Sequence, residues 1–373
     1  MSRLGHFGAR LHRGEVSFDF VGRQKVWYGI SVLIIVLAGC GLLFRGLNYG
    51  IEFKGGAVFT VKPAHTISTE QVRSDVAKVS GGDPIVQTQS NGDLRIQVGS
   101  LDSAKAHQVQ DALATDLNVP VSSVATQVVG PSWGSQITHK AVEGLIIFLV
   151  LVVAYMAIAF EWRMAVAALV ALLHDIVITV GVYALVGFQV TPATVTGLLT
   201  ILGYSLYDTV VVFDKVKENT RKIESGNKIT YSEAANLAVN QTLARSINTS
   251  LVALLPIAAM LFVGEAMLGA SDLNDLALAL FVGILAGTYS SIFIATPLLA
   301  DLKERQPEFK ALAKRVRARR ASDARKAAEA AERGEGTVPE GSGVAGAPED
   351  AVPAVAGPRR QPVHRNRASR KRH

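Results

Sequence analysis

Long apolar stretches alternate with polar segments along most of the chain. A hydrocarbon core of about 30 Å requires roughly 20 helical residues to cross it, and six stretches approach or reach that length with few ionisable residues inside them. The pattern predicts a polytopic α-helical membrane protein. The six predicted transmembrane helices cover residues 27–44, 141–160, 164–186, 193–213, 246–264 and 276–299.

The first of these stretches follows several basic residues, so a cleaved signal peptide is the alternative interpretation. The stretch is longer than the apolar core of most signal peptides, and no small-residue cleavage site of the A-x-A kind follows it. We therefore expect an uncleaved transmembrane helix, preceded by a short cytoplasmic N-terminus over residues 1–26.

The distribution of Lys and Arg between the loops predicts the orientation in the membrane. Basic residues precede the first helix and recur at Arg163, in the polar segment 214–245 and in the tail 300–373, so these parts are predicted to be cytoplasmic. The segment 214–245 is expected to hold a loop and the start of the fifth helix. The segments predicted to lie outside are residues 45–140, 187–192 and 265–275. Both termini are then cytoplasmic, in agreement with an even number of helices.

Residues 45–140 differ from the rest of the chain because they hold short runs of alternating apolar and polar residues, which are typical of strands. Asn91-Gly92 predicts a tight hairpin, since both central residues of a type I′ turn take positive φ. The predicted strands cover residues 57–61, 84–88, 94–98 and 124–129.

Two helical segments complete this region. Ser68 and Gln71 have the spacing of a capping box at the start of one helix, and residues 104–117 form the other. The order βαββαβ predicts an extracytoplasmic α+β domain of the ferredoxin-like kind between the first two transmembrane helices. It carries no paired catalytic carboxylates, no metal-binding cluster and no nucleophile with a base, so we expect it to bind or dock.

Composition supports a membrane protein and argues against nucleic-acid binding. Hydrophobic residues make up 49% of the chain and charged residues 18%, with a mean hydropathy of +0.28. The net charge of +7 comes from the tail, where 18 Lys and Arg stand against 10 Asp and Glu, whereas the remainder has 20 against 21. The tail is expected to be largely disordered after Arg333. Contact with anionic lipid is the favoured hypothesis for its basic residues, and contact with ribosomal RNA is the alternative.

Ionisable residues at membrane depth are costly, so they are candidates for function. Asp208 falls within the fourth predicted helix. Asp175, beside His174 in the third helix, could position helices or take part in proton transfer. Asp214 lies at the cytoplasmic end of the fourth helix and is more typical of an interfacial residue. Arg245 precedes the fifth apolar stretch, and its reach toward Asp208 would let protonation respond to conformation; a static ion pair is the alternative.

The sequence GYSLYDTVVVFDKVKEN over residues 203–219 resembles the fourth-helix signature of the SecD/SecF family of bacterial protein-export membrane proteins, on its SecF side. Further matches are FKGG at residues 53–56, His174-Asp175 and QTLARSINTS at residues 241–250. The family usually has Asn where this chain has Tyr207, and often Arg where it has Lys215. The matched motif residues are Phe53, Gly55, Gly56, Gly203, Tyr204, Ser205 and Thr209.

The resemblance implies six helices of the resistance-nodulation-division type in the bacterial plasma membrane. It implies pairing with SecD into a twelve-helix unit beside the SecYEG channel, which drives late export of a translocating preprotein with the proton gradient. By the same resemblance Asp208 and Arg245 belong to the proton pathway, with Asp175 and Asp214 as further candidates. No enzymatic site, cofactor or metal is implied.

Two other functions remain open at this level. One is a proton-coupled efflux permease of the same superfamily, although such permeases usually hold both six-helix halves in one chain. The other is a membrane scaffold whose buried charges serve only packing. Titration of Asp208 distinguishes the scaffold from a proton-coupled protein.

Overall fold

The computed structural model describes residues 17–65, 67–89, 92–221, 223, 228–268 and 271–333. Within these residues, six helical spans are long and apolar enough to cross a membrane, as the sequence predicts. Five of them are the single helices α2 (Gln24–Phe44), α6 (Pro131–Ala159), α7 (Trp162–Val186), α8 (Pro192–Thr220) and α9 (Tyr231–Leu268). The sixth combines α10 (Ser271–Ser290), a π turn (Ser291–Ala295) and α11 (Thr296–Glu304).

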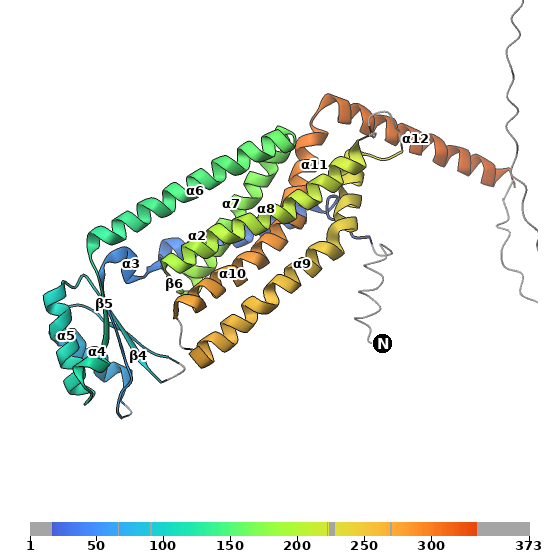
Figure 1. The fold of residues 1–373 in the computed structure, drawn as a ribbon. Coiled ribbons are helices and arrows are strands. Elements are labelled where there is room, and N and C mark those ends of the chain that lie inside the picture. The colour runs from blue at the N-terminus through green and yellow to red at the C-terminus, as the bar shows by residue number, and fades with distance from the viewer. Residues whose placement is uncertain are drawn as a thin grey trace, which may run out of the picture. The chain divides into compact units, whose positions relative to one another are not determined.

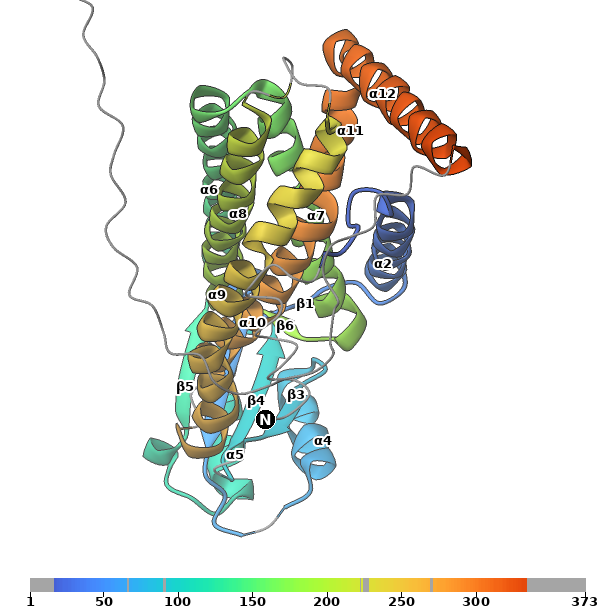
Figure 2. The ribbon, with the colours of Figure 1, turned by 90° about the vertical axis from the view of Figure 1, so that its right-hand side faces the viewer.

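Helices α8, α9 and α10 lie side by side (Figures 1 and 2) and pack extensively against one another. Glycines allow the closest approach between α8 and α10. A Cβ on Gly283 would lie 1.8 Å from the Ile201 side chain, and one on Gly287 would lie 2.9 Å from the Cβ of Ser205. Small residues at such contacts let helix backbones approach, which is how helices associate in a membrane.

Helix α2 packs on α7 through a similar contact. A Cβ on Gly181 would lie 2.8 Å from the Cα of Ala38, so only glycine fits there. At the end of α2 a short strand β1 (Asn48–Tyr49) pairs in parallel with β6 (Gln189–Val190), which connects α7 to α8. The sequence pattern did not predict this pair of strands, because two-residue strands have no detectable periodicity.

A four-stranded antiparallel sheet has the order β3-β4-β2-β5. Its strands are β2 (Gly56–Val61), β3 (Ile85–Thr88), β4 (Leu94–Gly99) and β5 (Ala125–Val129), close to the four predicted runs. Helices α4 (Thr69–Ser80) and α5 (Ser103–Asp116) pack on it (Figure 1) and enclose a core that includes Phe59, Ile96 and Leu113. The element order is the predicted βαββαβ.

The start of α4 follows the predicted capping pattern, since the Ser68 side chain accepts a hydrogen bond from the Gln71 amide. The predicted hairpin includes Asn91, which lies outside the described residues. A short helix α3 (Ile51–Lys54) and a 3₁₀ turn (Val121–Ser123) complete this region.

Helices α6 and α9 extend furthest beyond the predicted apolar stretches. Helix α6 begins at Pro131, immediately after β5, and α9 begins at Tyr231, well before its apolar part. Pro131 occupies the first turn, where its missing N–H is not needed. The first turns of both helices are polar, so they continue the helical hydrogen bonding without adding to the apolar stretch. Hydropathy alone therefore places the start of such a helix too far along the chain.

Helix α12 (Pro307–Glu332) follows α11. The chain divides into compact units at residues 1–322 and 323–373. In the described part of the second unit the helix continues, with Arg325 donating to Glu329 over 2.9 Å. The predicted disorder beyond Arg333 concerns residues outside those described.

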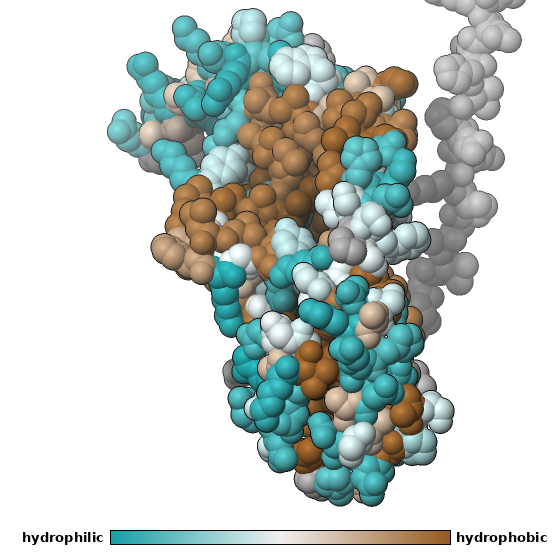
Figure 3. Space-filling model, turned by 90° about the vertical axis from the view of Figure 1, so that its left-hand side faces the viewer, coloured by the Kyte–Doolittle hydropathy of each residue, from teal (hydrophilic) through white to brown (hydrophobic). Residues whose placement is uncertain are grey.

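The helices present a broad hydrophobic surface, which Figure 3 shows as a band bounded by hydrophilic residues. Many of its side chains are large, including Leu33, Val150, Val252 and Phe262, each at least 60% exposed. An exposed surface of large apolar side chains is expected for helices in contact with lipid.

Replacing Gly181 by Ala should destabilise the protein by about 1–3 kcal/mol, because the added methyl group forces the α2 backbone away from α7. The matched control is Gly39→Ala, one residue from Ala38, where a Cβ meets nothing within 4 Å. That control should be neutral or slightly stabilising. Thermal unfolding of the purified protein measures both, and equal melting temperatures would contradict the close packing of α2 on α7.

Candidate functional site

The candidate site is centred on Asp208, which α8 carries into the middle of the bundle. The helix begins with a capping box made by Thr191 and Thr194, and its buried face includes Ile201, Ser205 and Asp208 at helical spacing. Asp208 is only 7% exposed. A carboxylate in this position needs hydrogen-bond donors, because burial without them costs several kcal/mol.

Two hydroxyl groups from other helices supply these donors. Ser246 of α9 donates to Oδ1 of Asp208 over 2.6 Å, and Ser291 donates to Oδ2 over 2.5 Å. Both serines are buried. The carboxylate therefore joins α8, α9 and the end of α10 through two charge-assisted hydrogen bonds, which are stronger than bonds between neutral groups.

Ser291 is the first residue of the π turn that interrupts the sixth span. The wider i→i+5 hydrogen bonding of a π turn changes the direction in which successive side chains point, and such turns frequently occur at functional sites. The Ser291 hydroxyl also lies 3.2 Å from the Thr288 carbonyl oxygen. It therefore has a second acceptor within reach when it does not donate to Asp208.

Asp175 forms a second buried site between α7 and α8. It is 1% exposed and accepts a hydrogen bond of 2.5 Å from Ser205, which precedes Asp208 by one helical turn. Its other oxygen lies 3.9 Å from Nδ1 of His174. The His174 ring stacks on Tyr289 with a centroid separation of 5.8 Å, and neither ring nitrogen has a hydrogen-bond partner among the described residues.

Arg245 does not reach Asp208, contrary to the expectation from the sequence. Its guanidinium donates to the Tyr207 hydroxyl over 3.1 Å, and the side chain is exposed. No ion pair joins it to Asp208 in the described part of the chain. The reason is helical geometry: Ser246 faces Asp208, and the preceding residue points about 100° away around α9.

Asp214 is exposed near the end of α8, as an interfacial residue would be. It lines a cleft of about 580 Å³ together with Glu161, Lys303 and Tyr231. Buried Lys303 forms an ion pair with Glu161, and its ammonium lies 5.8 Å from the Tyr231 ring. Asp214 is thus separate from the carboxylates Asp175 and Asp208 within the bundle.

The residues before the sheet form a tight connection. Phe53 lies in α3. Gly55 and Gly56 come after the helix with φ of 76° and 143°, which favour glycine. A Cβ on Gly56 would lie 2.3 Å from the Val98 carbonyl oxygen, and one on Gly134 of α6 would lie equally close to that of Phe53. Gly55 and Gly56 are therefore both needed at the start of β2.

The remaining motif residues have different environments. Thr209 is buried beside Asp208, whereas Gly203 is exposed on α8. Tyr204 is half-buried, and its hydroxyl has no partner among the described residues. In the same part of the chain, no group of three or more His, Cys, Asp or Glu residues could hold a metal ion.

Sequence reasoning missed Ser291 and did not single out Ser246 as a partner of Asp208. The available signal was the run Tyr289-Ser290-Ser291 inside an otherwise apolar stretch, since hydroxyl groups within membrane helices often hydrogen-bond across a bundle. The choice between Ser290 and Ser291 depends on the π turn, which has no such signal in this sequence.

Two family models match the chain. The model described as protein export membrane protein SecD/SecF, C-terminal, matches residues 109–305, and the SecD/SecF GG motif matches residues 41–66, which include Gly55 and Gly56.

Curated relatives agree with these models. The protein translocase subunit SecF of Streptomyces coelicolor is 58% identical over 367 residues, covering 98% of this chain and 97% of that one. The protein of the same name from Mycobacterium tuberculosis is 44% identical, covering 86% of this chain and 75% of its own length.

A solved structure is also similar. The crystal structure of SecDF, a translocon-associated membrane protein from Thermus thermophilus, matches with a TM-score of 0.68 and 32% identity. The match covers 78% of this chain and 39% of that longer one. Taken with the family models and the curated relatives, the match establishes that this chain belongs to the SecD/SecF family of protein-export membrane proteins.

Proposed function

We propose that the chain is the SecF-type half of a proton-driven unit in bacterial protein export, and that it pairs with SecD. The observation that carries this proposal is the Asp208 carboxylate, which joins three helices through two hydroxyl donors. Pairing with SecD is supported by the SecDF relative, in which a region like this chain makes up 39% of a longer polypeptide.

Protonation of Asp208 changes the hydrogen bonding at this point of the bundle. The ionised carboxylate only accepts hydrogen bonds, whereas the protonated form has an O–H that must itself donate. Ser291 can then turn its hydroxyl hydrogen to the Thr288 carbonyl oxygen, 3.2 Å away, and accept a hydrogen bond from the Asp208 O–H instead. The charge-assisted bond between α8 and the π turn is thereby replaced by a weaker neutral one. The proton thus alters how strongly α8 is held to α9 and α10.

The energies involved are comparable. One charge moved through 100 mV corresponds to about 2.3 kcal/mol. A hydrogen bond to a charged group contributes about 1.5–3 kcal/mol. A single proton driven by the gradient can therefore offset the loss of one such bond, and the two states of the bundle can alternate as protons pass.

Arg245, Asp175 and Asp214 have supporting roles in this proposal. Arg245 is exposed beside Tyr207 on the apolar face of α8 and α9, which suits contact with the SecD half. Asp175, linked by Ser205 to the helix that carries Asp208, is a second protonatable group on the route. Asp214, exposed near the end of α8, is the protonatable group at the cytoplasmic end of the route.

The four-stranded domain is proposed to be a ferredoxin-like, extracytoplasmic domain that holds the emerging preprotein beside SecYEG. Its strand order and antiparallel pairing fit this fold. The reciprocal amide hydrogen bonds between Gln97 of β4 and Gln189 of β6, 3.0 and 2.7 Å long, connect the sheet to the loop before α8. Movement of the bundle can reach the domain through this contact. With the domain outside, we also propose that both termini are cytoplasmic and that the basic tail contacts anionic lipid.

Asp208→Asn should abolish the stimulation of export by the proton gradient while leaving insertion and the melting temperature nearly unchanged, because an amide is close in shape and cheaper to bury. Translocation of a preprotein into inverted membrane vesicles, with and without a gradient, measures this. Glu143→Gln is the control, since Glu143 is 45% exposed and pairs only with Lys140 among the described residues. An Asp208→Asn variant that keeps the full response would favour the scaffold or show that another residue carries the proton.

Ser291→Ala should lower the free energy of unfolding by about 1–3 kcal/mol, because it leaves one oxygen of Asp208 without its donor. The adjacent Ser290→Ala is the control, since among the described residues buried Ser290 donates only to the Gly287 carbonyl of its own helix. In the Asp208→Asn background the cost of Ser291→Ala should fall by about 1 kcal/mol, which a double-mutant cycle measures. Additive effects would mean that the two side chains do not interact.

A further inference from the structure

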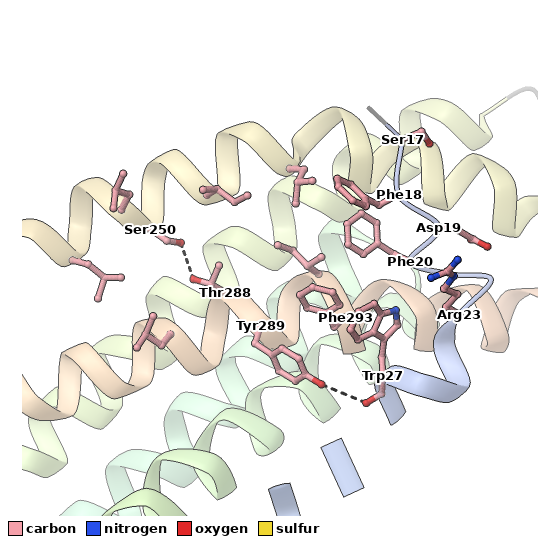
Figure 4. Close-up of a pocket in the computed structure, with 16 residues that line it drawn as sticks. Ser17, Phe18, Asp19, Phe20, Arg23, Trp27, Ser250, Thr288, Tyr289 and Phe293 are labelled. Atoms are coloured by element: carbon pink, nitrogen blue, oxygen red, sulfur yellow. Dashed lines mark hydrogen bonds between the residues drawn. The ribbon is translucent and has the colours of Figure 1, made fainter. Parts of the chain in front are cut away.

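An apolar groove of about 930 Å³ opens on the side of the bundle formed by α9 and α10. Its walls come from residues 17–23, from α2 and from these two helices (Figure 4), and include Phe20, Trp27, Leu254, Leu285 and Phe293. The volume is within the range of about 300–1,000 Å³ that is usual for sites of small ligands.

One end of the groove is polar. Figure 4 shows Arg23 and the indole nitrogen of Trp27 together at this end. The Trp27 Nε1 atom is buried without a hydrogen-bond partner, and Arg23 forms no ion pair within the described residues. Asp19 also lies here, but Figure 4 shows its side chain directed away from Trp27 and the apolar walls, and its carboxylate accepts a hydrogen bond of 2.8 Å from the Gly22 amide just before α2. The exposed Arg23 guanidinium therefore remains available to a ligand, and the unpartnered Trp27 N–H lies beside it.

The position of this end along the chain matches the depth of lipid headgroups. Arg23 and Lys25 directly precede residues 27–44, which contain no charge. Trp is enriched at the interface between lipid and water, and Arg extends its guanidinium toward headgroups. The apolar walls therefore lie at the depth of acyl chains, below the polar end.

We propose that this groove binds an anionic glycerophospholipid, with an acyl chain along α9 and α10 and the phosphate on Arg23 and Trp27. Charge complementarity selects the occupant, because the cationic end attracts an anionic headgroup and the remaining walls require an apolar chain. The inference depends on the placement of the helices in a membrane and not on proton coupling.

The occupant would contact the neighbours of both donors to Asp208. Ile247 and Ile292 line the groove and follow Ser246 and Ser291 in sequence. Ser250 and Thr288, which also line it, hydrogen-bond over 2.7 Å between α9 and α10. A bound lipid therefore sits against the two helices whose spacing the Asp208 site depends on.

The test uses the protein with Trp27 as its single tryptophan, made by Trp133→Phe and Trp162→Phe. It is reconstituted in phosphatidylcholine containing a minor fraction of brominated phosphatidylglycerol or brominated phosphatidylcholine, and Trp27 fluorescence is recorded. Brominated phosphatidylglycerol should quench at about fivefold lower mole fraction, as a site with one basic residue at the headgroup predicts. Arg23→Gln should remove this preference, and the control Lys25→Gln, outside the groove, should keep it.

Equal quenching by the two lipids would overturn the proposal, as would an equal loss in Arg23→Gln and Lys25→Gln, which indicates general surface charge. Absence of quenching by either lipid would also overturn it, because it would show that no lipid enters the groove. Leu254→Trp, in the otherwise wild-type chain, provides a second measurement because it fills the groove. Native mass spectrometry should then detect much less retained phosphatidylglycerol at an unchanged melting temperature, and undiminished retention would contradict the assignment.

Discussion

The need of a buried carboxylate for hydrogen-bond donors governs the arrangement of the bundle. Asp208 lies too deep among α8, α9 and α10 to be satisfied by bulk water, so its two oxygens take hydroxyl donors from Ser246 and Ser291. Those donors come from different helices. The same hydrogen bonds that satisfy the buried carboxylate therefore also join the helices, and we propose that a change in its protonation changes how they are held.

Other features of the bundle make this interaction possible. Gly283 and Gly287 bring α10 close enough to α8 for a short serine side chain to reach the carboxylate. The π turn that begins at Ser291 directs the hydroxyl toward Asp208 and leaves Thr288 as an alternative acceptor. Pro256 within α9 removes one backbone hydrogen bond from the helix that carries Ser246.

The membrane helices and the strands of the domain could be predicted from sequence because each has a periodic or continuous apolar pattern. Asp208 could be selected as a candidate from sequence because burying a charge is costly, and the structure shows it buried. The proposed reach of Arg245 to Asp208 was wrong because the sequence does not specify how α9 is rotated about its axis. The structure turns Ser246, and not Arg245, toward Asp208. Ser291 was missed since its role depends on a local π turn.

The central claim is that protonation of Asp208 weakens the hold of α8 on α9 and α10 and so lets these helices move. The direct test is the distance between spin labels on α7 and α9, at the exposed positions Leu173 and Val252, measured by double electron–electron resonance at several pH values. Cys40→Ser removes the single native cysteine, so labelling is specific. The account predicts a pH-dependent change of distance in the otherwise unmodified protein and none in Asp208→Asn. A change that persists in Asp208→Asn, or its absence from both, would contradict it.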